Sequence, residues 1–245
     1  MQSPTSRTVV FRVLAAAVLV LLVSSVWLGP IVVREVRARM SHYTVADRLV
    51  QYGPRVEGVW RERVVASGTE WPRRVTIVVN KESRELRVFG RVSGKQSELA
   101  KYAVTAASGG PGPKLCEGDK QVPEGVYRVE SLNPNSRFHL SLRVGYPSTE
   151  DKAAAVSEGR DVQNLGGDIM IHGGAASIGC VAIGDAAIEE VFWLVGTVGI
   201  ENVEIVMVPD WAPVKRIDAK TAPWLAERYR ELEKRLGELG LWSHA

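Results

Sequence analysis

The chain has 245 residues, of which 45% are hydrophobic and 24% charged, so it is long enough for one sizeable core with appendages. Its 31 basic and 28 acidic residues nearly balance, which argues against a surface that tracks nucleic-acid phosphates. The two cysteines, Cys116 and Cys180, are too few for a disulfide scaffold and too far apart for the short ligand pair of a zinc knuckle. We therefore expect one main domain and no nucleic-acid partner.

An uncharged apolar segment occupies residues 13–33, near the N-terminus. Its 21 residues correspond to a helix of about 31 Å, which matches the hydrocarbon thickness of a bilayer. Only a weak cleavage-site candidate, at residues 23–25, lies within it, so the sequence favours an uncleaved membrane anchor over residues 1–40. Arginines flank the segment on both sides, and charge alone therefore leaves its orientation open.

Residues 41–72 are predicted to form a helical lead-in to the main domain. Apolar residues between positions 43 and 68 recur at helical spacing, which indicates one or two helices. We expect a break at Gly53–Pro54, since proline lacks the backbone N–H that a helix interior needs.

The segment 73–209 is predicted to be the main domain and to be rich in strands. Residues 73–90 place Val75, Ile77 and Val79 on one face and turn at residues 80–83, which predicts a β-hairpin. Further segments of strand length follow at residues 101–108, 125–130, 168–173 and 203–208. The sequence thus predicts a mostly β (α+β) body with helices at its periphery.

Two helices are expected near the end of the chain. Asp185 is a suitable N-cap for a helix that stops near Gly196, because apolar residues recur between them at helical spacing. Residues 210–245 contain an amphipathic helix, which we expect to dock on the main domain. Its apolar stripe consists of Leu225, Tyr229, Leu232 and Leu236.

The stretch DIMIHGGAASIGCVAIGD, residues 168–185, places His172 eight residues before Cys180. A cysteine attacks as the thiolate, so it needs a base within reach and donors aimed at the oxyanion. The loop between the two residues contains Gly173, Gly174, Ser177 and Gly179. The glycines permit a tight return of the chain. Gly179 adds a backbone N–H beside that of Cys180. Ser177 is placed to orient the imidazole or to line the pocket. The same composition also suits a buried core strand, and the chemistry alone leaves both interpretations open.

The segment IHGGAASIGCVAI resembles the active-site signature of the YkuD-type L,D-transpeptidase family, in which His-Gly is followed by Ser-x-Gly-Cys. It is most similar to the YafK-type subgroup, whose histidine and cysteine stand close together. Upstream, EGDKQVPEGVYRV is similar to the family's Pro-x-Gly-x-Tyr segment at the start of a strand. Residues 132–151 resemble the subgroup's Asn-Pro-Asn-Ser segment that ends in Tyr-Pro. Three motifs in this order are more specific than any one of them, and the resemblance covers residues 73–209.

The resemblance implies a β-sandwich-like catalytic domain that acts on bacterial peptidoglycan stem peptides and needs no metal or other cofactor. Cys180 would be the acyl-enzyme nucleophile, His172 its general base, and the backbone carbonyl of Gly173 the third member that orients the imidazole. The implied chemistry is a two-step acyl transfer at diaminopimelate through a thioester. Because peptidoglycan lies outside the cytoplasmic membrane, the resemblance also implies an inner-membrane anchor and a periplasmic or otherwise extracytoplasmic catalytic domain.

The sequence departs from the family pattern at Ala182, where many members carry arginine or asparagine two positions after the cysteine. A polar group for substrate binding must then come from elsewhere. The candidates are Lys114, Arg137, Arg143 and Tyr146. The subgroup includes enzymes that hydrolyse the link between peptidoglycan and a covalently attached lipoprotein. Both an amine and water therefore remain open as the acyl acceptor. A lipoprotein linked to peptidoglycan also remains open as a partner.

Other interpretations concern the remaining residues that carry chemistry. One is a zinc site, although the spacings match no short ligand pair; its ligands would be Cys116, His139, His172 and Cys180. Another is a disulfide between the two cysteines, and a third is a non-enzymatic protein associated with the cell wall. Three acidic residues are interpreted as a solvated loop face: Glu117, Asp119 and Glu124.

Overall fold

The computed structural model describes residues 42–241. The membrane anchor predicted over residues 1–40 lies outside this described part. Of the helices that are described, none is both long enough and apolar enough to cross a membrane. From Tyr43 onward the chain is a single compact unit, and the boundaries expected inside it, at residues 72 and 209, remain predictions.

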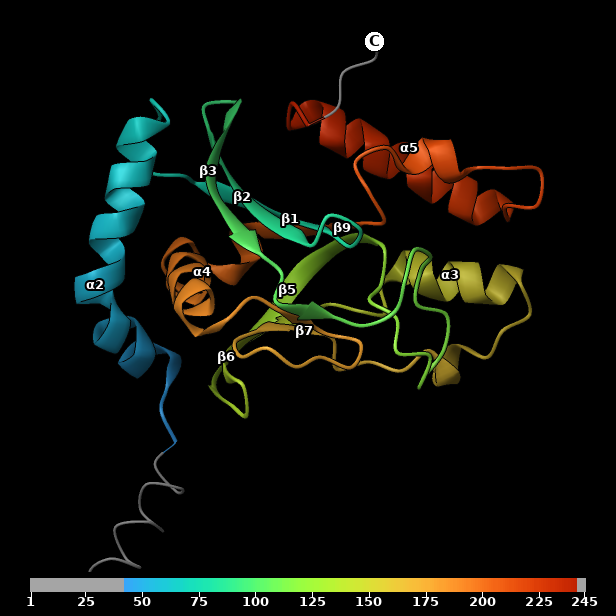
Figure 1. The fold of residues 1–245 in the computed structure, drawn as a ribbon, viewed down its shortest axis with the longest axis horizontal. Helices are drawn as coiled ribbons and strands as arrows, with labels where there is room; N and C mark the ends of the chain where they lie inside the picture. The colour runs from blue at the N-terminus through green and yellow to red at the C-terminus, as the bar shows by residue number, and fades with distance from the viewer. Residues whose placement is uncertain (1–41, 242–245) are drawn as a thin grey trace, which may run out of the picture. The chain divides into compact units, whose positions relative to one another are not determined.

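Within residues 42–241, nine strands form one mixed sheet in the order β3-β2-β1-β9-β5-β6-β7-β8-β4 (Figure 1). The strands are β1 (Arg74–Asn80), β2 (Glu85–Val92), β3 (Lys95–Ala103), β4 (Ala106–Ala107), β5 (Gly125–Ser136), β6 (His139–Val144), β7 (Met170–His172), β8 (Val181–Ala182) and β9 (Val203–Val208). The α-helices are α2 (Val45–Ala66), α3 (Thr149–Ser157), α4 (Asp185–Val198) and α5 (Pro223–Glu238), and the 3-10 helices are Val162–Asn164, Ile200–Asn202 and Pro213–Arg216. This arrangement confirms the prediction of a sheet-rich domain with several helices.

The two edges of the sheet are neighbours in sequence. The strand expected over residues 101–108 is in fact two strands, β3 at one edge and β4 at the other, with only Val104 and Thr105 between them. The two strand ends therefore lie within about 11 Å of each other, since consecutive Cα atoms are about 3.8 Å apart. Thr105 N–H also donates to the Ala182 carbonyl of β8. The sheet must consequently curl until its edges meet, which encloses the main core.

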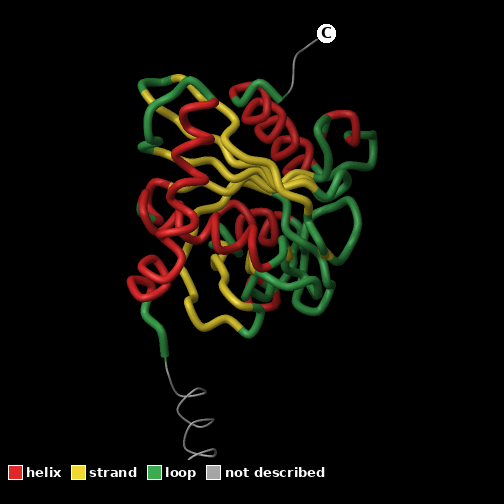
Figure 2. The backbone as a smooth tube through the Cα atoms, turned by 60° about the vertical axis from the view of Figure 1, so that its left-hand side comes forward, coloured by secondary structure: helices red, strands yellow, loops and turns green. Residues whose placement is uncertain are grey.

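The strand β1 is buried on both faces. Val75, Ile77 and Val79 face the main core, as their alternation predicts. Val78 points the opposite way and is also buried, because α5 packs Leu232 and its neighbours over that side. Figure 2 shows the strands lying between α5 on one side and α2 and α4 on the other. A helix on each side of the sheet explains why this strand is apolar at successive positions.

The break expected at Gly53–Pro54 is wrong, since α2 runs without interruption from Val45 to Ala66. Pro54 has no N–H to donate to the carbonyl group one helical turn before it. Pro54 is exposed, so this carbonyl group can bind water instead. Gly53 is buried against α4, where an added Cβ would lie 3.2 Å from the Trp193 indole nitrogen. Packing between α2 and α4 therefore stabilises a continuous helix that local propensity disfavours.

The helix predicted from Asp185 is α4, but its N-cap is Gly184, which makes no side-chain capping bond. Asp185 instead accepts a hydrogen bond from the Gly174 N–H at 2.8 Å. The helix also continues past Gly196 to Val198. Glycine at that position permits close packing on α2, because an added Cβ would lie 2.8 Å from Leu49.

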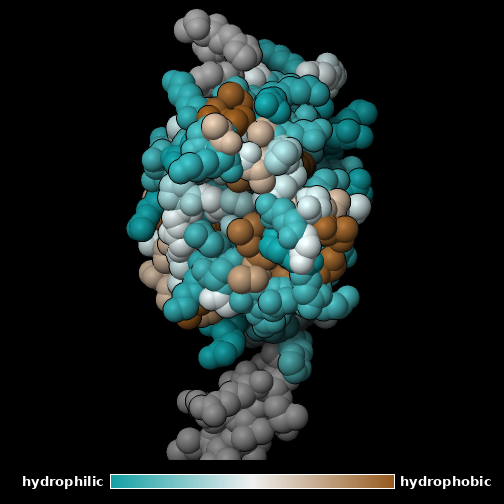
Figure 3. All heavy atoms as spheres, turned by 90° about the vertical axis from the view of Figure 1, so that its right-hand side faces the viewer, coloured by the Kyte–Doolittle hydropathy of each residue, from teal (hydrophilic) through white to brown (hydrophobic). Residues whose placement is uncertain are grey.

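The face that carries α3 and α5 is mostly hydrophilic, with hydrophobic atoms in small separate patches (Figure 3). Val156 of α3 is among the exposed apolar residues, with 68% of its surface accessible. Isolated apolar residues of this kind are normal on protein surfaces.

Candidate active site

Two adjacent short strands place the segments of His172 and Cys180 side by side. β7 and β8 are parallel, with Ile171 opposite Val181 and His172 opposite Ala182. Opposite residues in paired strands share a face, and so do residues two apart in one strand. His172 therefore shares its face with Ala182, and Cys180 lies in the bend immediately before β8.

His172 ends β7 and has only 2% of its surface accessible. Its Nδ1 lies 2.6 Å from the Gly173 carbonyl oxygen. A carbonyl oxygen only accepts, so Nδ1 carries the proton and Nε2 of the neutral ring has a free lone pair. Burial lowers the pKa of His172, and the hydrogen bond to Gly173 opposes that shift only in part. The histidine is therefore a neutral base with a fixed tautomer.

The thiol of Cys180 donates a weak hydrogen bond to the Asp168 carbonyl oxygen, at a sulfur–oxygen distance of 3.6 Å. Burial raises the pKa of this thiol, the backbone N–H of Met170 lowers it, and the charge of Asp168 raises it again. The net shift is upward, so the resting cysteine is a protonated thiol. The Cys180 thiol is directed to the start of β7, whereas His172 is the last residue of β7.

The turn after His172 requires glycine for two separate reasons. A Cβ added to Gly173 would lie 2.5 Å from Asp185 Oδ1 and 2.7 Å from the Phe138 carbonyl oxygen. Gly174 has a φ of +70°, a conformation that side chains disfavour. Asp185 was missed as a site residue, because a carboxylate at the start of a helix is expected to be its N-cap.

The other loop residues make backbone contacts around Cys180. Ser177 Oγ donates to the Cys180 carbonyl at 2.5 Å, so it holds the main chain of the nucleophile. The Gly179 N–H, which the sequence suggests as an oxyanion donor, donates to Ser108 Oγ. Ser108 in turn donates to the Lys120 carbonyl at 2.7 Å. Ser108 follows the edge strand β4, and no motif in the sequence indicates that it lies here.

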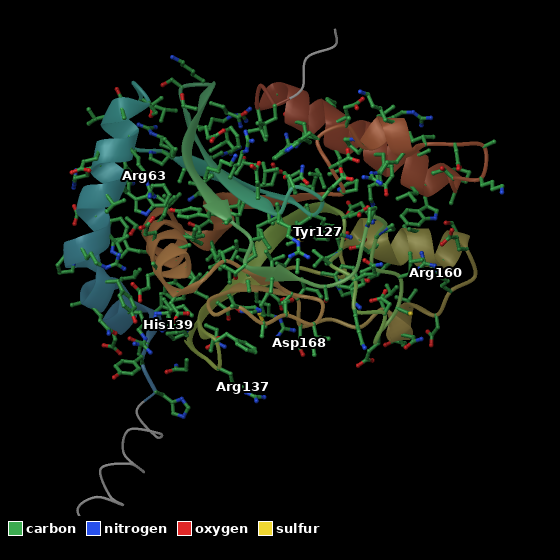
Figure 4. The ribbon with its side chains drawn as sticks, viewed as in Figure 1. Arg63, Tyr127, Arg137, His139, Arg160 and Asp168 are labelled. Carbon is green, nitrogen blue, oxygen red and sulfur yellow. The ribbon has the colours of Figure 1, made fainter. Side chains whose placement is uncertain are left out.

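The four candidates for substrate binding lie in different environments. Lys114 is buried and bound to Asp119 at 2.8 Å, and Tyr146 is buried with its hydroxyl directed at backbone carbonyls. Arg137 is exposed in the turn between β5 and β6, at the lower side of the molecule in Figure 4. Arg143 pairs with Asp168 at 2.7 Å. Only Arg143 is thus linked to the neighbourhood of the thiol, through Asp168.

Of the three acidic residues expected to be solvated, Glu117 is exposed and Asp119 is half-buried, whereas Glu124 belongs to a buried ion pair. Glu124 has none of its surface accessible and lies 2.9 Å from the Lys81 ammonium. It also accepts hydrogen bonds from the Gly112 N–H and the Tyr229 hydroxyl, both at 2.8 Å. The loop that holds the three acidic residues joins β4 to β5, so helix α5 is connected through Glu124 to the segment that follows Ser108.

The alternatives built on the cysteines and His139 find no support in residues 42–241. Both cysteines are free thiols. His139 Nε2 lies 2.6 Å from Glu189. Across that part of the chain, His, Cys, Asp and Glu side chains form no group of three that could hold a metal ion.

Comparison with known proteins identifies the family. A family model for the YkuD L,D-transpeptidase catalytic domain matches residues 74–205. This is more than half of the chain, which therefore belongs to that family. The resemblance carried by the three sequence motifs is confirmed, and the segment from β1 to β9 is an L,D-transpeptidase catalytic domain.

Individual relatives cover the chain only in part. Over 123 residues it is 35% identical to the Escherichia coli protein described as "Putative L,D-transpeptidase YafK", a match that covers 49% of this chain and 47% of that protein. The chain thus spans about half the length of the curated relatives it matches. Among solved structures it is similar to the helical cell shape determining protein Pgp2 of Campylobacter jejuni, with 22% identity, coverage of 65% and 52% of the two chains, and a TM-score of 0.47. L,D-transpeptidase 1 of Mycobacterium tuberculosis gives 14% identity, 55% and 62% coverage, and a TM-score of 0.32.

Proposed function

We propose that the chain is a cysteine-dependent acyltransferase acting on peptidoglycan stem peptides, with Cys180 as nucleophile and His172 as general base. The proposal depends on the pairing of β7 with β8, which brings the segment of Cys180 beside that of His172, and on the Gly173 carbonyl, which fixes the proton on Nδ1. A basic Nε2 beside a segment that carries a thiol suits nucleophilic acyl transfer. Family membership supports peptidoglycan peptides as the substrate class.

The reaction proceeds in two balanced steps. Nε2 of His172 accepts the thiol proton as Sγ of Cys180 bonds to the carbonyl carbon, and the imidazolium then protonates the leaving amine as the carbon–nitrogen bond breaks. In the second step an amine or water gives a proton to Nε2 and attacks the thioester, and the released thiolate takes that proton back. Gly173 keeps the ring oriented throughout.

The resting state supports proton transfer during attack and argues against a stored thiolate. Burial raises the pKa of Cys180 and lowers that of His172, so both groups are neutral near pH 7. The thiol must first exchange its hydrogen bond to Asp168 for one to Nε2. Hydrogen bonds of this kind often form only in the substrate complex.

Hydrolysis of the peptidoglycan–lipoprotein linkage at diaminopimelate is the second candidate. The observation that favours it is Ala182, which is fully buried and paired with both His172 and Ala106. This position offers no polar side chain to hold an incoming peptide amine, and water as the acceptor needs none. A lipoprotein linked to peptidoglycan would then be the substrate.

The proposal includes a location outside the cytoplasmic membrane, where peptidoglycan lies. Residues 1–40 would anchor the chain in the inner membrane, because the apolar stretch at 13–33 has the length of a bilayer-spanning helix. The catalytic domain would follow on the periplasmic side.

The deciding experiment compares the full chain with its Cys180→Ala variant. Each is incubated with peptidoglycan fragments bearing tri- and tetrapeptides and with lipoprotein-linked fragments, and the products are identified by mass. New cross-links indicate transfer to an amine, and release of the lipoprotein-derived peptide indicates hydrolysis. Cys116→Ala is the matched control and should keep full activity. Unchanged turnover by Cys180→Ala would disprove the assignment of the nucleophile.

A further inference from the structure

The turn between β5 and β6 carries an aromatic side chain next to the general base. Ser136 pairs with His139, so Arg137 and Phe138 are the two residues of the turn. Phe138 has 44% of its surface accessible, which is unusual for a large apolar side chain in a domain with an extensive core. Its position needs an explanation other than burial in that core.

The ring of Phe138 is stacked on the imidazole of His172. The ring centroids are 4.6 Å apart and the planes differ by 26°. His172 itself is almost fully buried, whereas Phe138 is half exposed. One face of the phenylalanine ring therefore covers the base and the other faces solvent. Stacked aromatic pairs at this distance are favourable beyond the area that they bury.

The surrounding residues keep this turn over the base. Next to Phe138, His139 has a φ of +75°, and its imidazole lies 2.6 Å from Glu189 of α4. The turn also packs closely against the two glycines after His172. A Cβ added at Gly173 would lie 2.7 Å from the Phe138 carbonyl oxygen, and a Cβ added at Gly174 would lie 3.6 Å from the Phe138 ring. The glycines after His172 thus leave the space that the turn occupies.

We propose that Phe138 is a positioning residue for His172: its ring is the wall that keeps the imidazole in the plane set by the Gly173 hydrogen bond and shields one face of it from water. This inference rests on the proposed function, since it concerns the same base. It assigns Phe138 no contact with the reacting atoms. A merely structural role in the turn would leave the titration of His172 unchanged, and the positioning role would not.

The first test is titration of His172 in the full chain by NMR of its imidazole protons. His172→Gln assigns the signal by its loss. In Phe138→Ala the pKa of His172 should move up from its lowered value towards 6.5, because water reaches the uncovered face. Phe138→Trp keeps a stacking ring and should retain the wild-type titration. Phe138→Leu keeps an apolar cover without the stack, so the pKa of His172 should lie between those in Phe138→Ala and wild type. This variant replaces Phe138→Ala if the alanine variant fails to fold.

The second measurement is turnover. Phe138→Ala should lower kcat about tenfold or more with little change in KM, and should move the acid limb of the pH profile in the same direction as the NMR titration. Val156→Ala, a truncation of an exposed apolar side chain on α3, is the control and should change neither quantity. A His172 titration that is identical in wild type, Phe138→Ala and Phe138→Leu would overturn the inference. The titration needs no turnover, so it tests the role of Phe138 separately from the proposed function. The proposed function is overturned by a different result, an active Cys180→Ala variant.

Discussion

Burial acts in opposite directions on the two groups at the centre of the site. It lowers the pKa of the His172 imidazole and raises the pKa of the Cys180 thiol, so both favour their neutral forms. The sequence proposes His172 and Cys180 as site residues through the resemblance of three ordered motifs to the family signature, whereas their spacing alone leaves a buried core strand open. Phe138, Asp168 and Asp185 could not be predicted, because each reaches the site by a contact that only the packed strands create.

Alkylation of Cys180 should follow the raised pKa of its thiol. The thiolate is the reactive form, so in the folded protein the rate with iodoacetamide should rise through a midpoint above the ordinary thiol value of 9.0. In urea the same cysteine should react with an ordinary midpoint, because the burial is lost. The measurement uses Cys116→Ala, which leaves one thiol. A folded-state midpoint below that of the unfolded chain would contradict a protonated resting thiol.

Gly173→Ala should destabilise the protein and abolish most activity. The added methyl group would meet Asp185 and the Phe138 carbonyl, and such overpacking costs about 1–3 kcal/mol. Urea denaturation followed by circular dichroism gives the change in the free energy of unfolding. Gly58→Ala in α2 is the control, since its Cβ would enter open space and should leave stability unchanged or raise it. Equal effects of the two substitutions would show that space at Gly173 does not matter.

At the scale of elements, α5 is joined to the domain by polar contacts as well as by its apolar stripe. Arg228 pairs with Asp151 of α3 at 2.7 Å, and Tyr229 donates to the buried Glu124. The stripe could be predicted from its helical periodicity, but these two contacts could not, because they join segments 77 and 105 residues apart. For the same reason the break at Pro54 was expected wrongly: the packing of Gly53 on Trp193 is a tertiary contact.

Tyr229→Phe should destabilise the protein by about 1–3 kcal/mol, the cost of leaving a buried acceptor without its donor. Glu124 would then keep only Lys81 and the Gly112 N–H. The free energy of unfolding in urea measures the loss. Tyr43→Phe removes a hydroxyl from an exposed tyrosine and should change it by less than about 0.5 kcal/mol. No difference between the two variants would mean that the Tyr229–Glu124 bond contributes nothing to stability.

At the scale of the whole molecule, the site depends on the curl of the sheet. The chain crosses from β3 to β4 in two residues, which brings Ser108 beside Gly179 even though 71 positions separate them. The approach of the two edge strands follows from the order of the strands in the sheet. That order cannot be read from the alternation of apolar and polar residues in any single strand.

Membrane attachment is the prediction that concerns the whole chain. The full chain should remain with the membrane fraction after a carbonate wash, because residues 13–33 are apolar over a bilayer-spanning length. A chain that begins at residue 41 should be released. Replacing two leucines within 13–33 by arginine is a second check, since each charge in the hydrocarbon costs about 2.5 kcal/mol or more. Recovery of the full chain in the wash would contradict the anchor.

Local sequence patterns were sufficient to predict the strand-rich class, the hairpin of β1 and β2, and the strand β9. These features depend on local periodicity and spacing, which each segment carries alone. The tertiary structure decided the tautomer of His172, the hydrogen bond that holds the Cys180 thiol, the stack of Phe138 and the burial of Glu124. Each of these depends on which distant segment lies opposite, and that is settled only when the sheet curls and its core is packed.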